Sequence, residues 1–210
     1  MRLKKGMTLV AVGFLFISFY VNINLKGGVL TLPPSFIGWI LFVLAYPKIV
    51  KYTSYSISLY WIPLVLAVYS VLNWVLNLIN LSIYFPLLSI AAGVLTIVYL
   101  VKLLGCLELL ARDYARNLVP RVHTLNVLYL SLEIALSVFA FLLVTLPRVG
   151  GAPALALITI LLLIAGLAAA VVTILICVTL FQLRKAIPDE DLSPAENDPT
   201  GGDFGPMGTN

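Results

Sequence analysis

Apolar residues fill this chain in runs long enough to cross a bilayer, with short polar stretches between them. A membrane-spanning helix needs about 20 predominantly apolar residues. The pattern therefore predicts an all-α bundle of six transmembrane helices, at residues 6–21, 34–50, 57–78, 83–106, 125–146 and 153–183. The last run contains no polar turn, so it predicts one long helix. From residue 187 onward the apolar pattern ends, and residues 187–210 are expected to form a disordered acidic tail in the cytosol.

The distribution of lysine and arginine predicts how these helices are threaded. Basic residues precede the first apolar run and follow the second, fourth and sixth, whereas the opposite connections contain only Lys26 and Arg148. Because cytoplasmic loops of membrane proteins are enriched in Lys and Arg, both termini are expected to be cytoplasmic. The residues on this basic side are Arg2, Lys4, Lys5, Lys48, Lys51, Arg112, Arg116, Arg121, Arg184 and Lys185.

The second predicted helix leaves two alternatives open. Residues 34–46 alone would rise about 20 Å, which is short for a hydrocarbon core of about 30 Å. Either the helix continues through Pro47, or the segment is re-entrant and every later helix is inverted. The basic bias favours the continuous helix, because inversion would place the arginine-rich connection after the fourth run outside the cell.

Composition places the chain in the membrane. Of its 210 residues, 61% are hydrophobic and 10% are charged, and the mean hydropathy is +1.08; soluble domains are about half apolar and a quarter charged. The net charge of +4 includes the acidic tail, so the rest of the chain is strongly basic. Anionic lipid headgroups, rather than nucleic acid, are the expected partner of these bases. The N-terminal segment lacks a small-residue cleavage site and is expected to remain as the first helix of a multi-pass protein of the cell membrane.

Few side chains indicate chemistry. Cys106 and Cys177 lie far apart in apolar runs and are expected to be buried, inert thiols. His123 is the only histidine, and a single ligand does not make a metal site. No H-E-x-x-H, P-loop or G-x-S-x-G motif is present. The sequence therefore indicates neither an enzyme nor a bound metal or cofactor.

The least lipid-like stretch within the membrane part joins the first two apolar runs. Two asparagines end the first run, and a double glycine and a double proline follow. These residues predict a tight extended loop that leads into a helix at about residue 34. The helix then offers a glycine notch where another helix can approach closely, followed by a tryptophan expected at the membrane interface. The motif residues are Gly27, Gly28, Pro33, Pro34, Gly38 and Trp39.

Residues 30–41, LTLPPSFIGWIL, resemble an "LLPDFIGYIL"-like signature of small, uncharacterised multi-pass membrane proteins of Firmicutes-type bacteria. The preceding Asn-Ile-Asn at residues 22–24 fits the same resemblance. This chain has Pro34-Ser35 where the signature has Pro-Asp, so any function of that acid would be altered here. The resemblance implies a bacterial membrane protein with no known activity.

One face of the fifth predicted helix is polar. Asn126, Tyr129, Glu133 and Ser137 follow a helical spacing, and a carboxylate inside a bilayer is costly, so this face should point inward. Lys102 lies at a similar depth in the antiparallel fourth helix. Either Lys102 pairs with Glu133, or Lys102 extends to the headgroups and Glu133 is protonated or bonded to a neighbouring hydroxyl. These residues are the candidate intramembrane polar site.

A second polar stripe lies towards the outer surface. Three asparagines of the third predicted helix share one face, and the two asparagines of the loop lie at the same depth. Their amides can bond between helices. Alternatively, they can line an outward-opening pocket that is roofed by residues 27–34 and flanked by Trp39 and Trp74. The candidate stripe comprises Asn73, Asn77, Asn80, Asn22 and Asn24.

Three functions remain open. The basic loops and the acidic tail favour a non-enzymatic scaffold, assembly or regulatory partner that binds another protein or a second copy. Small-residue spacings, Ser89 with Gly93 and Gly166 with Ala170, predict close helix packing in such a protein. The size and helix number are similar to those of vitamin-binding subunits of energy-coupling-factor transporters, which suggests small-solute binding or transport, although an A-x-x-x-A motif is missing from the first run. Cation- or proton-coupled transport through Glu133 is the third hypothesis.

Overall fold

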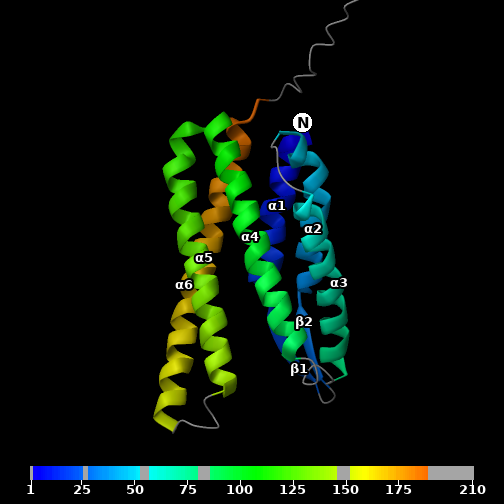
Figure 1. The fold of residues 1–210 in the computed structure, drawn as a ribbon, viewed down its shortest axis with the longest axis vertical. Coiled ribbons are helices and arrows are strands. Elements are labelled where there is room, and N and C mark those ends of the chain that lie inside the picture. Colours follow the sequence, from blue (N-terminus) through cyan, green and yellow to red (C-terminus); the bar gives the residue numbers. More distant parts are fainter. Residues whose placement is uncertain (1, 26–27, 53–56, 80–85, 146–151, 189–210) are drawn as a thin grey trace, which may run out of the picture.

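The structure is a computed structural model that describes residues 2–25, 28–52, 57–79, 86–145 and 152–188. Within these residues the chain is mostly helical, with one small sheet (Figure 1). The helices are α1 (Arg2–Ser18), α2 (Ser35–Ile49), α3 (Ser58–Leu78), α4 (Pro86–Tyr114), α5 (Val119–Thr145) and α6 (Ala152–Ala186), with the strands β1 (Val21–Leu25) and β2 (Gly28–Leu32) and the short 3-10 helices η1 (Val50–Tyr52) and η3 (Arg116–Leu118). The predictions for Gly27, Asn80 and the tail from residue 189 concern residues outside these ranges.

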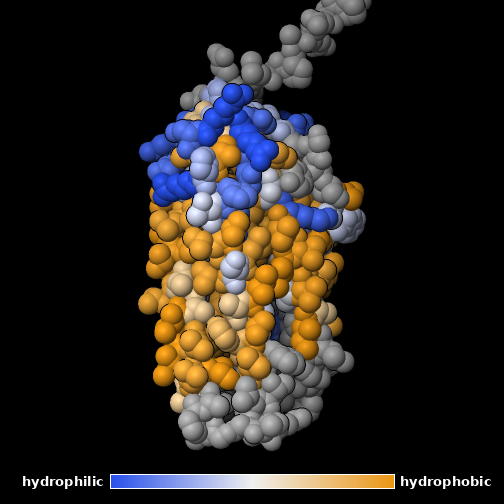
Figure 2. Space-filling model, turned by 60° about the vertical axis from the view of Figure 1, so that its left-hand side comes forward, coloured by the Kyte–Doolittle hydropathy of each residue, from blue (hydrophilic) through white to orange (hydrophobic). Residues whose placement is uncertain are grey.

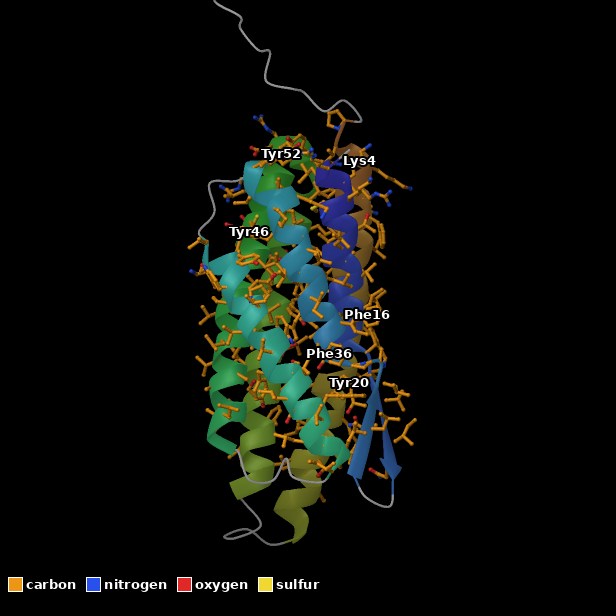
Figure 3. The ribbon with its side chains drawn as sticks, turned by 90° about the vertical axis from the view of Figure 1, so that its right-hand side faces the viewer. Lys4, Phe16, Tyr20, Phe36, Tyr46 and Tyr52 are labelled. Carbon is orange, nitrogen blue, oxygen red and sulfur yellow. The ribbon has the colours of Figure 1, made fainter. Side chains whose placement is uncertain are left out.

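The helices pack as a ring. Each helix contacts the next one in sequence, and α6 returns to contact α1. The start of α1, the turn between α4 and α5 and the end of α6 all lie at one end of the bundle, and the sheet lies at the other (Figure 1). We call the first end the basic end, because the described lysines and arginines gather there above a broad apolar band (Figure 2). Lys4 and Tyr52 lie at this end, and Phe36 and Tyr20 lie towards the sheet (Figure 3).

Five helices are long and apolar enough to cross a membrane: α2 together with η1, α3, α4, α5 and α6. Helix α2 continues through Pro47, as the continuous alternative requires. Helix α1 has 17 residues and starts with basic side chains. Its apolar part from residue 6 rises about 20 Å, less than a hydrocarbon core of about 30 Å. A helix was predicted over residues 6–21, but α1 ends three residues earlier, at Ser18, because the chain enters β1 at Val21.

The expectation of an all-α chain needs one correction, because β1 and β2 form an antiparallel hairpin where a loop was predicted. Asn22 pairs with Thr31 and Asn24 pairs with Val29 in its register. The Thr31 hydroxyl donates to Asn22 Oδ1 at 2.8 Å, which ties the two strands through their side chains. Alternation of apolar and polar residues along β1 was the available signal, since side chains of a strand alternate between its two faces. The Leu32–Pro33 peptide bond after the hairpin is cis.

Glycines bring α1 and α2 into close contact. A Cβ atom added at Gly38 would lie 2.6 Å from Ile17 Cγ1 and 2.7 Å from the Gly13 carbonyl oxygen. A Cβ added at Gly13 would lie 2.7 Å from the Phe42 ring. The notch predicted at Gly38 thus receives α1. Sequence spacing did not identify Gly13 as its partner, because the partner lies on another helix.

Trp39, the tryptophan expected at the membrane interface, is buried among the helices, and its depth in the membrane stays a prediction. Only 4% of Trp39 is exposed. Its ring lies edge-on to Phe42 and to Tyr99, with centroid distances of 5.7 Å in both pairs. Phe14 lies edge-on to Phe42 at 5.4 Å and to Tyr129 at 5.8 Å. These five rings form an aromatic cluster, because α1 and α4 cover the face of α2 that carries Trp39.

The small-residue spacings on α4 and α6 did not predict close packing correctly. A Cβ added at Gly93 or at Gly166 would meet nothing within 4 Å. Helix faces with small residues are common by chance, and their partners depend on the tertiary arrangement. The close helix contact is instead between α1 and α2.

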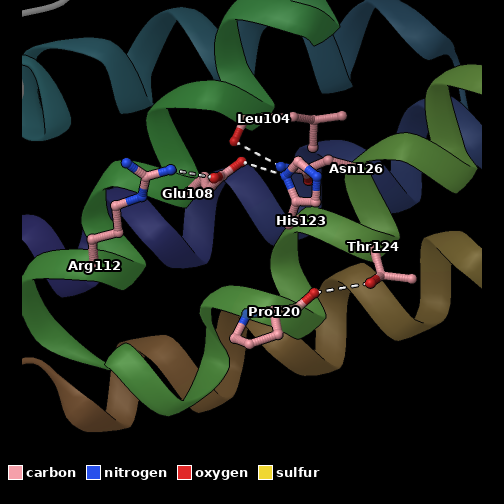
Figure 4. Close-up of polar contacts among 7 residues, drawn as sticks. All are labelled: Leu104, Glu108, Arg112, Pro120, His123, Thr124 and Asn126. Carbon is pink, nitrogen blue, oxygen red and sulfur yellow. Dashed lines mark hydrogen bonds and ion pairs between the residues drawn. The ribbon is translucent and has the colours of Figure 1, made fainter.

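Polar contacts at the basic end join α4 to α5. Helix α4 extends past its apolar run as far as Tyr114, and Arg112 Nη2 donates to Glu108 Oε1 at 2.8 Å within it. His123 Nδ1 of α5 lies 3.2 Å from Glu108 Oε2 (Figure 4). Glu108 therefore contacts a basic residue on its own helix and the histidine of the next helix.

Candidate functional site

A cavity lies inside the ring, and we call it the inner cavity. It has a volume of about 590 Å³ and is bounded by side chains of α1, α2, α4, α5 and α6, with Tyr20 just after α1. A hollow with polar atoms inside it is visible in the apolar band in Figure 2. The aromatic cluster contributes Phe14, Trp39, Phe42 and Tyr129 to its wall. Gly166 on α6 also lines it, which explains the open space beside this glycine.

Polar side chains from three helices meet in the inner cavity. The Tyr129 hydroxyl lies within hydrogen-bonding reach of Glu133 on its own helix, of Ser18 on α1 and of Thr173 on α6. The Thr173 hydroxyl is 3.3 Å from the Ser18 hydroxyl and also donates to the Ala169 carbonyl at 2.9 Å. Glu133 is the only charged side chain in the described lining. The cavity therefore combines apolar and aromatic walls with one acid and six hydroxyl groups, three of which, on Tyr129, Ser18 and Thr173, lie together.

Of the two alternatives for Lys102 and Glu133, the ion pair is not formed in the structure, and Glu133 lies beside the Tyr129 hydroxyl. The Lys102 ammonium donates to the Ser58 hydroxyl at the start of α3, with an Nζ–Oγ distance of 2.7 Å. Lys102 faces α3, whereas Glu133 faces the inner cavity beside Tyr129. Lys102 and Glu133 were expected to pair because they lie at similar depth in antiparallel helices. Depth does not determine the direction in which a side chain points around its helix axis, so the two side chains face different neighbours.

The predicted polar face of α5 divides into two parts. Tyr129, Glu133 and Ser137 line the inner cavity. Asn126 is buried nearer the basic end, where its Nδ2 donates to the Leu104 carbonyl of α4 at 3.1 Å. Asn126 thus stabilises the contact between α4 and α5. Ser18 and Thr173 join Tyr129 and Glu133 in the cavity, and no sequence pattern indicated this, since the two residues lie on different helices.

A second cavity, the outer cavity, lies between the hairpin and α3. Its volume is about 430 Å³, and Asn22, Thr31, Asn73, Trp74 and Asn77 are among its lining residues. The structure thus gathers three of the five asparagines of the candidate stripe around one space. The fourth, on β1 beside Asn22, does not line this cavity, and the fifth, at position 80, is outside the described residues.

Direct contacts hold the hairpin against α3. A Cβ added at Gly28 would clash with the carbonyl oxygens of Asn77 and Leu78, so β2 passes close to the end of α3. The Trp74 indole N–H donates to the Thr31 carbonyl at 3.0 Å. The Phe36 ring lies edge-on to Trp74, with a centroid distance of 5.9 Å. Trp74 flanks the outer cavity as expected, whereas the other predicted flank, the tryptophan of α2, lines the inner cavity.

No protein-family model matches the sequence, and neither a curated protein nor a solved structure is significantly similar to it. In the structure, residues 30–41 form the end of β2 and the start of α2, including the glycine that receives α1. The likeness of this segment to a bacterial signature stays a prediction. Among the described residues, no three His, Cys, Asp or Glu side chains gather as a metal site requires.

Proposed function

We propose that this chain is a multi-pass protein of the bacterial cell membrane, with six crossings and the basic end in the cytoplasm. Five long apolar helices and the broad apolar band of Figure 2 support the membrane location. The basic residues at one end support the orientation, because Lys and Arg are enriched in cytoplasmic loops.

Within this membrane protein, the inner cavity binds a small amphipathic solute without chemical conversion. The observation that carries this proposal is a cavity of about 590 Å³ that contains one carboxyl group among apolar and aromatic walls. Ligand sites in proteins typically have volumes of about 300–1,000 Å³, mostly apolar walls and a few polar groups that orient the ligand. The walls here suit a hydrocarbon or aromatic skeleton, and the carboxyl group suits a hydrogen-bond donor.

Electrostatics favours a cationic group on this solute. A carboxylate away from water is costly unless it is protonated or paired with a positive charge. Lys102 does not pair with Glu133, since its ammonium bonds Ser58. A protonated amine placed beside Glu133 would supply the missing positive charge, and Tyr129, Ser18 and Thr173 can orient it through their hydroxyl groups.

The proposal is tested by ligand-dependent thermal stability of the purified protein. A series of hydrophobic amines is compared with alcohols of the same carbon skeletons. We expect the amines to raise the unfolding temperature more than the alcohols, and Glu133→Gln to remove this difference. Glu108→Gln is the matched control, because Glu108 lies at the basic end outside the cavity and should keep the preference for amines. Equal responses to amines and alcohols in the unmodified protein would overturn the role of Glu133.

A cavity-filling variant tests the location independently. Gly166 lines the inner cavity and has nothing within 4 Å of an added Cβ, so the ring of Gly166→Phe would start from open space beside the cavity. Ligand stabilisation should then disappear while the protein stays folded. Gly93→Phe is the control, since Gly93 has equally open surroundings but does not line the cavity. Undiminished stabilisation in Gly166→Phe would show that the solute binds elsewhere.

Cation-coupled transport is a second candidate function, favoured by the position of Glu133 between α5, α1 and α6 hydroxyl groups. A transporter would carry the amine across the membrane, whereas a binding protein would only hold it. Uptake of a radiolabelled amine into proteoliposomes separates the two. Uptake that depends on Glu133 would support transport, and binding without uptake would support a binding protein.

A further inference from the structure

The outer cavity differs from the inner cavity in chemistry. Its described lining consists of amides, hydroxyls, aromatic rings and one valine, with no charged side chain. Its volume of about 430 Å³ also lies in the range of ligand sites. Its lining includes Asn22, Val29 and Thr31 of the hairpin, which lies at the end of the bundle opposite the basic end (Figure 1). A ligand recognised here would therefore be polar, uncharged and approached from the side opposite the cytoplasm.

The amides of α3 are positioned for a ligand rather than for packing. Asn73 and Asn77 are half-buried, and among the described residues neither side chain forms a hydrogen bond with another protein group. Among the described residues no buried side-chain nitrogen or oxygen lacks a hydrogen-bond partner, so the amide groups of Asn73 and Asn77 reach open space, where water or a ligand can bond them. Asn22 also lines the cavity, and its Oδ1 accepts from the Thr31 hydroxyl.

The aromatic side of the cavity is held in place. Trp74 lines the cavity, and its indole N–H is already bonded to the Thr31 carbonyl. Phe36 packs edge-on against the same ring. Trp74 is thus fixed in orientation and offers the cavity an apolar surface, while Tyr20 adds a second aromatic side chain.

We propose that the outer cavity binds an uncharged saccharide. Sugar hydroxyls both donate and accept hydrogen bonds, as do side-chain amides, and three asparagines surround the space. The C–H face of a sugar ring is apolar and matches a fixed aromatic ring such as Trp74. The absence of charge in the described lining disfavours an amino acid or a phosphate, because a charge buried without a partner is costly. The inference does not depend on the function proposed for the inner cavity.

Two sources can supply this chemistry: a free sugar and the headgroup of a glycolipid. Binding of free sugars is measured by isothermal titration of the purified full chain in an amine-oxide detergent, because common detergents with maltose headgroups would compete. Glucose, maltose and trehalose are the probes, and glycine and inorganic phosphate are the charged comparisons. The glycolipid source is tested in nanodiscs of phosphatidylglycerol with or without monoglucosyl diacylglycerol, with the unfolding temperature as the readout.

Variants locate the site. Asn73→Ala removes one amide from the cavity and should weaken saccharide binding about three- to tenfold, the effect of losing a hydrogen bond of about 0.5–1.5 kcal/mol. Asn24→Ala is the matched control on the same hairpin, since Asn24 does not line the cavity, and it should bind as the unmodified chain does. The unfolding temperature without ligand shows whether each variant is folded. If Asn73→Ala does not fold, Asn77→Ala is used for the same test.

Each outcome decides the proposal. Saturable binding of a free saccharide, with an affinity that is lower in Asn73→Ala but unchanged in Asn24→Ala, supports a site for a free sugar. Stabilisation only in nanodiscs with the glucosyl lipid, with the same dependence on Asn73, supports a headgroup site. The proposal is overturned if no saccharide source binds, if phosphate or glycine binds as well as the sugars do, or if both variants bind alike. Amine binding at the inner cavity is measured separately, so failure of one site is distinguishable from failure of the other.

Discussion

Two glycine-to-alanine substitutions should have opposite effects on stability. Gly38 and Gly166 both lie in apolar helices, so the local change is the same in both variants. An added Cβ at Gly38 would lie 2.7 Å from the backbone oxygen of Gly13 and 2.6 Å from Ile17 Cγ1. At Gly166 the Cβ would meet nothing within 4 Å. Comparison of the two variants therefore separates the effect of helix propensity on stability from the effect of helix packing.

The magnitudes follow from these surroundings. Alanine is more favourable than glycine in a helix interior by about 0.5–1 kcal/mol, and Gly166→Ala should show this stabilisation. Gly38→Ala should be destabilising, because overpacking of a close contact costs about 1–3 kcal/mol and the backbone of α1 cannot move aside like a flexible side chain. After the helix gain is subtracted, we expect a net loss of about 1–2 kcal/mol. Because the helix term is the same in both, the two variants should differ by the cost of overpacking, about 1–3 kcal/mol.

The assay is reversible unfolding of the purified protein by a denaturing detergent, followed by far-ultraviolet circular dichroism. Gly93→Ala is a second control, since its added Cβ would also meet nothing within 4 Å. Gly93→Ala should therefore resemble Gly166→Ala. The reasoning would be refuted if Gly38→Ala were as stable as the unmodified protein, or if Gly166→Ala lost as much stability as Gly38→Ala.

Three further predictions concern buried groups and threading. Asn126→Leu removes the interhelical bond to the Leu104 carbonyl and should lower the unfolding free energy by about 0.6–2 kcal/mol in the same assay; no loss would contradict a structural role. Cys106 and Cys177 are buried, so both should react with maleimide far more slowly in the folded protein than in denaturing detergent, and equal rates would contradict their burial. A cysteine in place of Arg116, between α4 and α5, should be inaccessible to an impermeant maleimide added to intact cells, and labelling would reverse the proposed orientation.

Helix positions could be predicted because each depends on nearby residues. The starts of α2 and α3 lie within one residue of their predicted positions, at Ser35 and Ser58. Proline suits the first turn of a helix, and long apolar runs have few alternatives to a helix in a bilayer. The ion pair between Glu108 and Arg112 was also predictable, because residues four apart lie on one helix face.

The candidate sites were only partly predictable. The sequence identified Glu133, Asn73 and Asn77 as polar residues in apolar helices. It did not show that Thr173 would join Glu133 at one cavity, or that the hairpin would bring Asn22 to α3. Such contacts depend on the rotation of each helix about its axis, which is determined by the packing of all its neighbours.

The sequence alone determined the apolar, membrane-like character, the helix-forming segments and the separation of basic ends from apolar spans. These features depend on the preference of each side chain for lipid or water, which does not require knowledge of its neighbours in space. The tertiary structure decided which glycine contacts another helix and which faces open space, that Lys102 bonds Ser58, and that one cavity lies inside the ring of helices while a second lies between the hairpin and α3. The physical reason is distance along the chain: Gly13 and Gly38 meet, and Ser18 and Thr173 meet, only after separate helices have packed together.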